Sequence, residues 1–342
     1  MQIDRDYILK LAQEILTIPS PSGYTEEIVA RIALEAKHFG LAYRQTKKGN
    51  LLITVPGKTD KKIGLSVHVD TLGAMVRSIT ADGTLKFTSI GGPSWPTLDG
   101  EYCSIRTRDH KTYTGTFLST SPAVHVFKDA NTKTRSPEEM VVRIDEVVRS
   151  KEDVEALGIE VGNYIFFDPK TTITPSGFIK SRFLDDKINV ASLFGMVKAF
   201  QDTGKVPEST LEIIISTYEE VGHGAAFIPE LDEMVAIDMG CIGDDLSCTE
   251  FDVSICAKDS SGPYDYELTS RFAALAKAHK LNYAVDIYPY YGSDVSAARS
   301  GGNDFKGALI GPGVHASHGM ERTHIDAVLN TVKLLILYTT TP

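Results

Sequence analysis

Hydrophobic residues at the start of the chain recur at helical spacing and then give way to short continuous runs. Residues 5–16 are apolar at Ile8, Leu11 and Ile15, which predicts a helix that ends at the proline-rich segment TIPSPSG. Thr25 is predicted to be the N-cap of a second helix, TEEIVARIALEAKHFG, which has glutamates in its first turn. The runs NLLITVPG and KIGLSVHVDT then predict strands.

The pattern changes from about Gly73 to an alternation of apolar and polar residues. The segment SITADGTLKFTSIGG predicts a hairpin around its Asp-Gly turn, and YCSIRTRDHKTYTGTFL alternates like a half-exposed pair of strands. VGNYIFFDP predicts a further strand, and only residues 137–157 suggest a helix in this part of the chain. These short strands favour a small β-barrel, which would hide strand edges that otherwise aggregate.

Alternation of helices and strands returns at the segment SGFIKSRFLDDK. Helices are predicted near residues 187–203, 266–279 and 325–338, and LEIIISTY and MVAIDMG read as buried strands. The pattern therefore predicts an α/β fold interrupted by a β-rich insertion. We expect a discontinuous catalytic domain over residues 1–72 and 173–342, and an inserted domain over residues 73–172.

Composition limits the classes of partner. The 342 residues are 42% hydrophobic and 23% charged, as in globular proteins, and the net charge of −10 argues against a nucleic acid or an anionic membrane as partner. Charges interrupt the first residues where a secretion signal would be apolar, so a cytoplasmic location is expected. The four cysteines show no CxxC spacing, which favours reduced structural thiols over a disulfide framework.

Acidic residues and histidines follow the predicted strands of the α/β domain. In open α/β sheets, ligands bind beyond the carboxyl ends of the strands. This set of oxygen and nitrogen ligands suits zinc, cobalt or manganese, and it exceeds what one tetrahedral zinc needs, so two metals sharing a carboxylate are expected. The candidates are His68, Asp70, Asp185, Asp186, Glu219, Glu220, Asp238, His315, His318 and His324.

Each of these signals also has an ordinary structural explanation. A His-Xaa-Asp sequence arises often by chance, Asp-Asp-Lys is commonly a solvated helix start, and Asp238 alone could cap a turn into Gly240. His223, His315 and His324 taken singly read as surface histidines. The joint occurrence at strand ends is what indicates a metal site. Of the adjacent glutamates after LEIIISTY, one is then expected to bind metal and the other to act as general base.

Several segments together resemble the M42 family of dinuclear metallo-aminopeptidases, which includes glutamyl aminopeptidases and TET peptidases. They are L..IPSPSG at 16–23, HVDT at 68–71, LDDK at 184–187, YEEVG at 218–222, AIDMG at 236–240 and YGSDVSA at 291–297. The resemblance covers nearly the whole chain. It implies a phosphorylase/hydrolase-like mixed-sheet catalytic domain with an inserted, barrel-like dimerisation domain. It also implies two divalent ions per subunit, and a homo-oligomer that is a dimer or a tetrahedral dodecamer assembled from dimers.

The same resemblance implies roles for individual residues. His68, Asp185 and Asp238 would be metal ligands with Asp185 bridging, and Glu220 a further ligand. Glu219 would be the general base and Asp70 would orient His68. The last ligand in the family is a histidine in a His-Ser-Xaa-Xaa-Glu-like segment. Here the segment HGME at 318–321 is one residue shorter, so His318 is the first choice, followed by His315 and His324.

The expected activity is hydrolysis of amino-terminal residues from peptides. The long gap between Asp70 and Asp185, where the β-rich segment lies, separates this chain from M20 amidohydrolases, in which the extra domain comes later. A metal-dependent amidase or deacylase on a non-peptide substrate is the nearest alternative, and a cellulase-like glycoside hydrolase is a more distant one. The loops at 259–266 and 290–297, with Tyr264, Tyr290 and Tyr291, are candidate walls of the substrate pocket.

Overall fold

The computed structural model describes residues 2–342 and divides into two compact units. Unit 1 consists of the chain up to Thr71, Lys170–Ser317 and Glu321–Pro342, and unit 2 consists of Leu72–Pro169 and His318–Met320. One continuous segment therefore builds most of unit 2, and the segments on both sides of it build unit 1. None of the helices in these residues is long and apolar enough to span a membrane.

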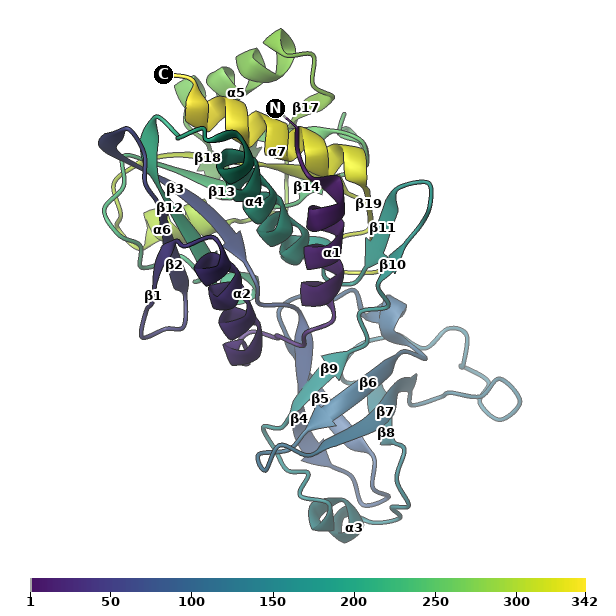
Figure 1. Ribbon diagram of the computed structural model, residues 1–342. Helices are drawn as coiled ribbons and strands as arrows, with labels where there is room; N and C mark the ends of the chain where they lie inside the picture. The colour runs from purple at the N-terminus through teal and green to yellow at the C-terminus, as the bar shows by residue number, and fades with distance from the viewer. Residues whose placement is uncertain (1) are drawn as a thin grey trace. The chain divides into compact units, whose positions relative to one another are not determined.

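A ten-stranded mixed sheet forms the centre of unit 1 (Figure 1), in the order β1-β2-β12-β3-β13-β18-β15-β16 with β14 beside β18 and β17 beside β15. The strands are β1 (Ala42–Gln45), β2 (Leu51–Val55), β3 (Thr59–His68), β12 (Ser209–Ser216), β13 (Glu233–Ile237), β14 (Gly240–Cys241), β15 (Val253–Asp259), β16 (Gly262–Pro263), β17 (Tyr283–Ile287) and β18 (Lys306–Val314). The four neighbours β12, β3, β13 and β18 are parallel, so their carboxyl ends meet at one edge of the sheet.

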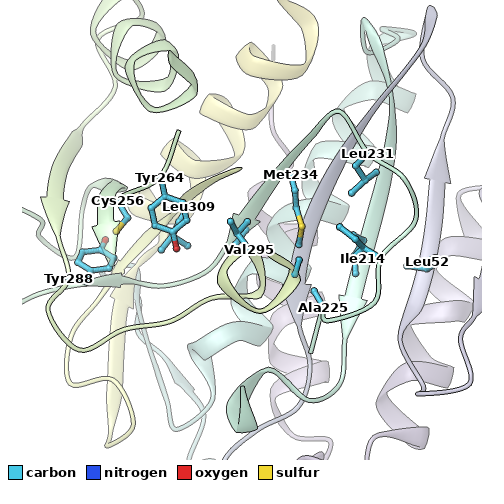
Figure 2. Close-up of a cluster of buried hydrophobic side chains, with 13 residues drawn as sticks. Leu52, Ile214, Ala225, Leu231, Met234, Cys256, Tyr264, Tyr288, Val295 and Leu309 are labelled. Carbon is cyan, nitrogen blue, oxygen red and sulfur yellow. The ribbon is translucent and has the colours of Figure 1, made fainter. Parts of the chain in front are cut away.

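Apolar side chains cover both faces of this sheet. Ile214 of β12 belongs to a buried cluster with Met234 of β13 and Val295 of α6 (Asp294–Ser300), drawn in Figure 2. Neighbouring strand residues point to opposite faces, so the fully buried Ile213 and Ile215 lie against the other face. Burial on both faces explains why this strand reads as a continuous apolar run rather than an alternation.

The helix α4 (Leu184–Thr203) is buried along most of its length. Every residue from Leu184 to Val197 is buried, because α4 packs on β3 and against α1 and α7. Its acidic start is therefore held inside the protein. The other helices of unit 1 are α1 (Arg5–Leu16), α2 (Glu26–His38), α5 (Tyr266–Ala278) and α7 (Ile325–Thr340), and a small sheet contains β10 (Thr172–Ile173), β11 (Phe178–Ser181) and β19 (Glu321–His324).

Unit 2 is a closed β-barrel in the order β4-β5-β8-β7-β6-β9. Its strands are β4 (Gly73–Ile79), β5 (Leu85–Ile90), β6 (Tyr102–Arg106), β7 (Thr112–Ser119), β8 (Met140–Ile144) and β9 (Tyr164–Phe167). Phe87 and Phe117 meet edge to face with ring centroids 5.0 Å apart, and Phe167 packs on Phe117 at 5.3 Å. These rings fill the interior. The prediction of a mixed-sheet α/β domain with an inserted β-barrel is thus confirmed.

One predicted element is wrong. The helix suggested over residues 137–157 is formed only at α3 (Lys151–Ala156), and Met140–Ile144 is the barrel strand β8. In β8 the side chains alternate between buried and less buried positions, and the strand pairs with β7 along its whole length. Pairing that completes the barrel therefore overrides the local helical character of the surrounding residues.

Candidate metal centre

Several candidate side chains of unit 1 lie at the carboxyl ends of the parallel strands β3, β12 and β13. His68 is the last residue of β3, and Asp70 lies two residues beyond it. Glu219 begins the short 3-10 helix η2 (Glu219–Val221), just after β12, and Asp238 directly follows β13. Asp185 lies at the start of α4, where its backbone is not yet helical. The fold thus brings residues from distant parts of the sequence to one place.

His68 lies at the centre of this group and is 2% exposed. Its Nε2 is 3.0 Å from Oδ1 of Asp185 and 3.9 Å from Oε2 of Glu219. Its Nδ1 lies 3.0 Å from the backbone carbonyl oxygen of Asp70. A ring whose Nδ1–H donates to that carbonyl presents Nε2 as the ligand atom, and Nε2 faces the carboxylates.

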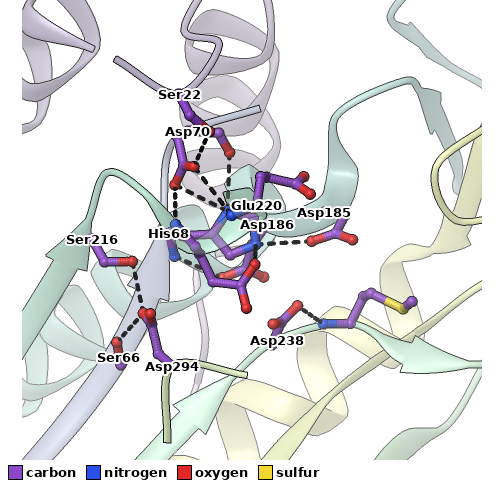
Figure 3. Close-up of polar contacts among 12 residues, drawn as sticks. Ser22, Ser66, His68, Asp70, Asp185, Asp186, Ser216, Glu220, Asp238 and Asp294 are labelled. Carbon is purple, nitrogen blue, oxygen red and sulfur yellow. Dashed lines mark hydrogen bonds and ion pairs between the residues drawn. The ribbon is translucent and has the colours of Figure 1, made fainter. Parts of the chain in front are cut away.

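Asp70 has a second contact that the sequence did not reveal. Its Oδ1 accepts the backbone N–H of Glu219 at 3.0 Å, and its Oδ2 accepts that of Glu220 at 3.2 Å. Ser22 donates its hydroxyl to Oδ2 at 2.6 Å (Figure 3). The Asp70 carboxylate is fully buried, so these bonds replace the water it has lost. Asp70 therefore holds the turn that carries both glutamates.

Two overlapping groups of side chains are arranged so that they could hold a divalent ion. His68, Asp185 and Glu220 form one group, and His68, Asp186 and Asp238 form the other, with the ligand atoms of each group within 4.8 Å of one another. The donors are imidazole nitrogen and carboxylate oxygen, as zinc, cobalt and manganese prefer. The residues present thus fit a metal by both chemistry and spacing.

Asp186 is a site residue whose role sequence reasoning missed. Its Oδ2 accepts the backbone N–H of His68 at 3.1 Å, and its Oδ1 accepts Nδ2 of Asn189 at 2.6 Å. Asp186 and Asn189 are fully buried. These bonds make Asp186 a support for the His68 backbone, and its oxygens keep lone pairs for the candidate metal group with His68 and Asp238. The Asp-Asp pair was the only sequence signal.

Burial raises the pKa values of the site carboxyls because removal from water disfavours the charged form. The pKa of Asp238 rises to about 7, through burial and then the charge of Asp185. Burial also raises the pKa of Glu219 well above its usual value, with repulsion from Asp238 and Asp294 adding to it against the attraction of His68. Burial acts to lower the pKa of His68, but contact with Asp185 and Glu219 holds it well above the usual value. The buried acids therefore resist ionising together, and a bound cation would favour their charged forms.

The three candidate histidines near the carboxyl end lie in different surroundings. His324 caps α7: its Nδ1 accepts the N–H of Asp326 at 3.2 Å, and its Nε2 contacts the Ser176 carbonyl at 2.8 Å. Both nitrogens are engaged, so His324 serves a structural role here. His315 is exposed and pairs through its backbone with Arg322. His318 belongs to unit 2, where its Nδ1 lies 2.9 Å from the Gly92 carbonyl, and its ligand role stays a prediction.

A buried glutamate also supports Asp185. Glu321, at the start of β19, is 1% exposed, and its Oε2 accepts the backbone N–H of Asp185 at 3.0 Å. The hydroxyl of Ser317 lies 3.4 Å from Oδ2 of Asp185. These contacts fix Asp185 from the carboxyl-terminal part of the chain, and only the fold could reveal them.

The three tyrosines proposed for the substrate pocket differ in exposure. Tyr264 is 6% exposed and donates its hydroxyl to Asp259 at 2.7 Å, so it is a core residue rather than a pocket wall. Tyr290 is 97% exposed. The hydroxyl of Tyr291 donates to the Met239 carbonyl, next to Asp238, at 3.2 Å. Of the three, only Tyr291 is placed against the acidic cluster by these contacts.

Solved structures share this architecture and define the fold class as that of the TET peptidases. A TET aminopeptidase from a Thaumarchaeota archaeon has a TM-score of 0.89 at 20% identity, covering 98% of this chain and 96% of that chain. A Pyrococcus horikoshii TET1 peptidase has a TM-score of 0.85 at 23% identity, covering 98% and 100%. A Thermotoga maritima structure named as an endoglucanase has a TM-score of 0.75 at 16% identity, covering 96% of each chain.

Sequence comparison then gives the family. The profile of the M42 glutamyl aminopeptidases matches residues 49–334. The protein named "Putative aminopeptidase YhfE" from Bacillus subtilis (strain 168) is 46% identical over 337 residues, which cover 98% of this chain and 97% of that protein. The chain belongs to the M42 glutamyl aminopeptidase family and is a peptide hydrolase. M42 aminopeptidases are metal-dependent, in keeping with the grouped donors around His68.

Proposed function

We propose that the protein is a dinuclear metal-dependent aminopeptidase that removes amino-terminal residues from peptides. The observation that carries the proposal is the pair of overlapping donor groups around His68, one with Asp185 and Glu220 and the other with Asp186 and Asp238. The two groups contain more carboxylates than one tetrahedral ion needs, and two ions sharing a carboxylate would use them.

In this proposal His68, Asp185 and Asp238 hold one ion, and Asp185 and Glu220 contribute to holding the other. The sequence motif makes His318 the candidate for the last ligand. Zinc or cobalt is the expected metal, with manganese as an alternative. When bound, the two ions would polarise the scissile carbonyl, lower the pKa of the attacking water and accept the free α-amine of the substrate. The requirement for a free amine accounts for removal of terminal residues only.

Glu219 is assigned the proton transfers. Its side chain is 16% exposed, and its backbone is fixed by the Asp70 carboxylate. Glu219 takes a proton from the attacking water as the water oxygen bonds to the carbonyl carbon. It then gives this proton to the leaving nitrogen as the C–N bond breaks, so the carboxylate is regenerated. Asp70 and Asp186 act as positioning residues for Glu219 and His68.

The decisive test uses metal-stripped protein and a panel of aminoacyl p-nitroanilides, with zinc, cobalt and manganese added separately. We expect a metal to restore cleavage of substrates with a free α-amine, and no cleavage of their N-acetylated counterparts. Preference for an acylated substrate would instead favour the amidase or deacylase alternative. Activity on cellulose that survives a chelator would favour the glycosidase, whose paired carboxyls flank the sugar without metal.

A homo-oligomer is also part of the proposal. Solved structures of similar fold are described as a dodecamer, and as a tetrahedron or a large octahedral shell. By analogy, we assign the joining of subunits to the closed barrel of unit 2, which contains none of the assigned catalytic groups. A dimer is the smallest assembly we expect, and a tetrahedral dodecamer is the larger alternative.

A further inference from the structure

The loop of residues 222–225 directly follows the two glutamates and is bound by side chains from distant parts of unit 1. The ammonium group of Lys48 donates to the carbonyl of His223 and, at 3.1 Å, to that of Gly224. The amide of Asn50 also donates to the Gly224 carbonyl, at 2.9 Å. Asn50 is 2% exposed, whereas Lys48 is partly exposed. Donors from the segment before β2 therefore hold the carbonyls of this loop.

The buried carboxylate of Asp294 binds a backbone N–H group of the same loop. Oδ1 of Asp294 accepts the N–H of Ala225 at 2.9 Å. Oδ2 of Asp294 accepts the hydroxyls of Ser66 on β3 at 2.6 Å and of Ser216 on β12 at 2.7 Å (Figure 3). Asp294 is 3% exposed. Such a carboxylate stays buried at low cost only while these donors stay in place.

The loop is bonded directly to the glutamate turn, because the N–H of Gly222 donates to the Glu219 carbonyl at 2.7 Å and that of His223 to the Tyr218 carbonyl at 3.1 Å. A Cβ atom on Gly224 would lie 2.5 Å from Oδ1 of Asp294, 2.8 Å from Oγ of Ser216 and 2.9 Å from the backbone nitrogen of Glu219. These separations are below normal contact, so only glycine fits. The backbone bonds of the loop would therefore transmit a displacement of the loop to the backbone of the turn.

Charges of opposite sign act on the two sides of the loop. The ammonium of Lys48 binds the carbonyl side and the carboxylate of Asp294 binds the N–H side, as the peptide dipole favours. Burial lowers the pKa of Lys48, and attraction to Asp294 and Asp70 opposes that effect. Lys48 also lies over the ring of Tyr218, 5.5 Å from its centroid, on the residue before Glu219. The cation thus contacts both ends of the segment that contains the glutamates.

We propose that Lys48 and Asp294 are positioning residues that fix the Glu219 turn by clamping the loop of residues 222–225. This inference rests on the proposed role of Glu219 as general base. Asp70 then holds the start of the Glu219 turn, and Lys48 and Asp294 hold the loop at its end. Neither Lys48 nor Asp294 touches the reacting atoms. Their effect on turnover comes from keeping the Glu219 carboxylate in reach of the attacking water.

The test compares Lys48→Met with Lys47→Met, a matched control that removes the same charge from the exposed neighbour. Loss of a charged hydrogen-bond donor should lower kcat by about tenfold in Lys48→Met, with KM within about twofold of the wild type. Metal content and the melting temperature should stay unchanged. Lys48→Arg should recover part of the lost kcat, because it keeps a charged donor. Lys47→Met should behave as the wild type.

Hydrogen exchange provides a readout that does not depend on activity. Backbone amides of residues 218–226 should exchange faster in Lys48→Met and in Asp294→Asn than in the wild type and in Lys47→Met. Unchanged exchange, or a wild-type kcat in Lys48→Met, would overturn the clamp. If both variants exchange faster as expected but the wild type cleaves no peptide, the proposed function is refuted and the clamp is retained. Loss of metal in Lys48→Met would mean that Lys48 acts on the metal ligands rather than on Glu219, and would contradict the inference.

Discussion

At the scale of single residues, Glu219 and Glu220 are chemically identical but are placed differently. Glu220 shares a ligand group with His68 and Asp185, whereas the groups found among residues 2–342 leave out Glu219. Glu219 still approaches Nε2 of His68 to 3.9 Å. A carboxylate beside a metal site that is not needed as a ligand is available for proton transfer, which is why we assign Glu219 as the base.

The first prediction follows from this difference. Glu219→Gln removes the proton acceptor but keeps the size of the side chain, so kcat should fall by at least about a hundredfold. Bound metal, measured by mass spectrometry of the purified protein, should stay at the wild-type level. Glu220→Gln is the matched comparison and should lose metal as well as activity. Near-normal turnover of a fully metallated Glu219→Gln would show that another group is the base.

A pH prediction follows from the raised pKa values of His68, Asp186, Glu219 and Asp238. Groups with a raised native pKa bind more protons in the folded than in the unfolded state. They therefore stabilise the fold below their unfolded pKa, and this stability is lost as pH rises through the native pKa. For Asp238 that window runs from its ordinary value of 3.8 to about 7.

We therefore expect chelator-treated protein to melt at a lower temperature near pH 8 than near pH 5.5, because the stability linked to proton binding is lost at the higher pH. Added zinc or cobalt should raise the melting temperature most at the higher pH, because a cation binds the ionised carboxylates in competition with protons. Calorimetry at both pH values, with and without metal, measures this. A metal-free protein that gains stability toward pH 8 would contradict the arrangement of buried acids described here.

At the scale of elements, the sequence was informative wherever one local pattern determined the structure. The short β-branched run before Glu219 predicts a buried strand, and β12 forms there. The polar strand β19 and its small sheet carry no such pattern and were not predicted. The same holds within the site. Residues at strand ends could be expected to meet, but the bonds from Asp70 to the Glu219 turn and from Glu321 to Asp185 depend on long-range packing.

Helix α7 offers a test that separates a structural histidine from the proposed ligand. His324 caps this helix, so His324→Ala should lower stability by about 1 kcal/mol, the usual cost of losing such a cap, with metal content unchanged. His324→Asn, which keeps a capping oxygen, should recover much of that loss. His318→Ala should instead lose bound metal. If His324→Ala lost metal and His318→Ala kept it, the assignment of the last ligand would have to be exchanged.

At the scale of the whole molecule, the two units divide the work that the proposal requires. Unit 1 contains the central donors His68, Asp185 and Glu220, whereas the assigned ligand His318 belongs to the short segment grouped with unit 2. The barrel strands of unit 2 contain no assigned catalytic residue. A closed barrel has no free strand edge, so association through it would use side chains rather than added strands. The barrel therefore is the part whose removal should affect assembly most directly.

The last prediction concerns a chain in which residues 73–168 are replaced by a short Gly/Ser linker. The cut stays clear of β10, which belongs to the small sheet of unit 1. Unit 1 has its own sheet and apolar core, so we expect the shortened chain to fold, with helical circular dichroism and a cooperative melt as the check. Light scattering coupled to size exclusion should then show an oligomeric wild type and a monomeric deletion. An unchanged oligomer in the folded deletion would place the interface on unit 1, and a monomeric wild type would remove the proposed assembly altogether.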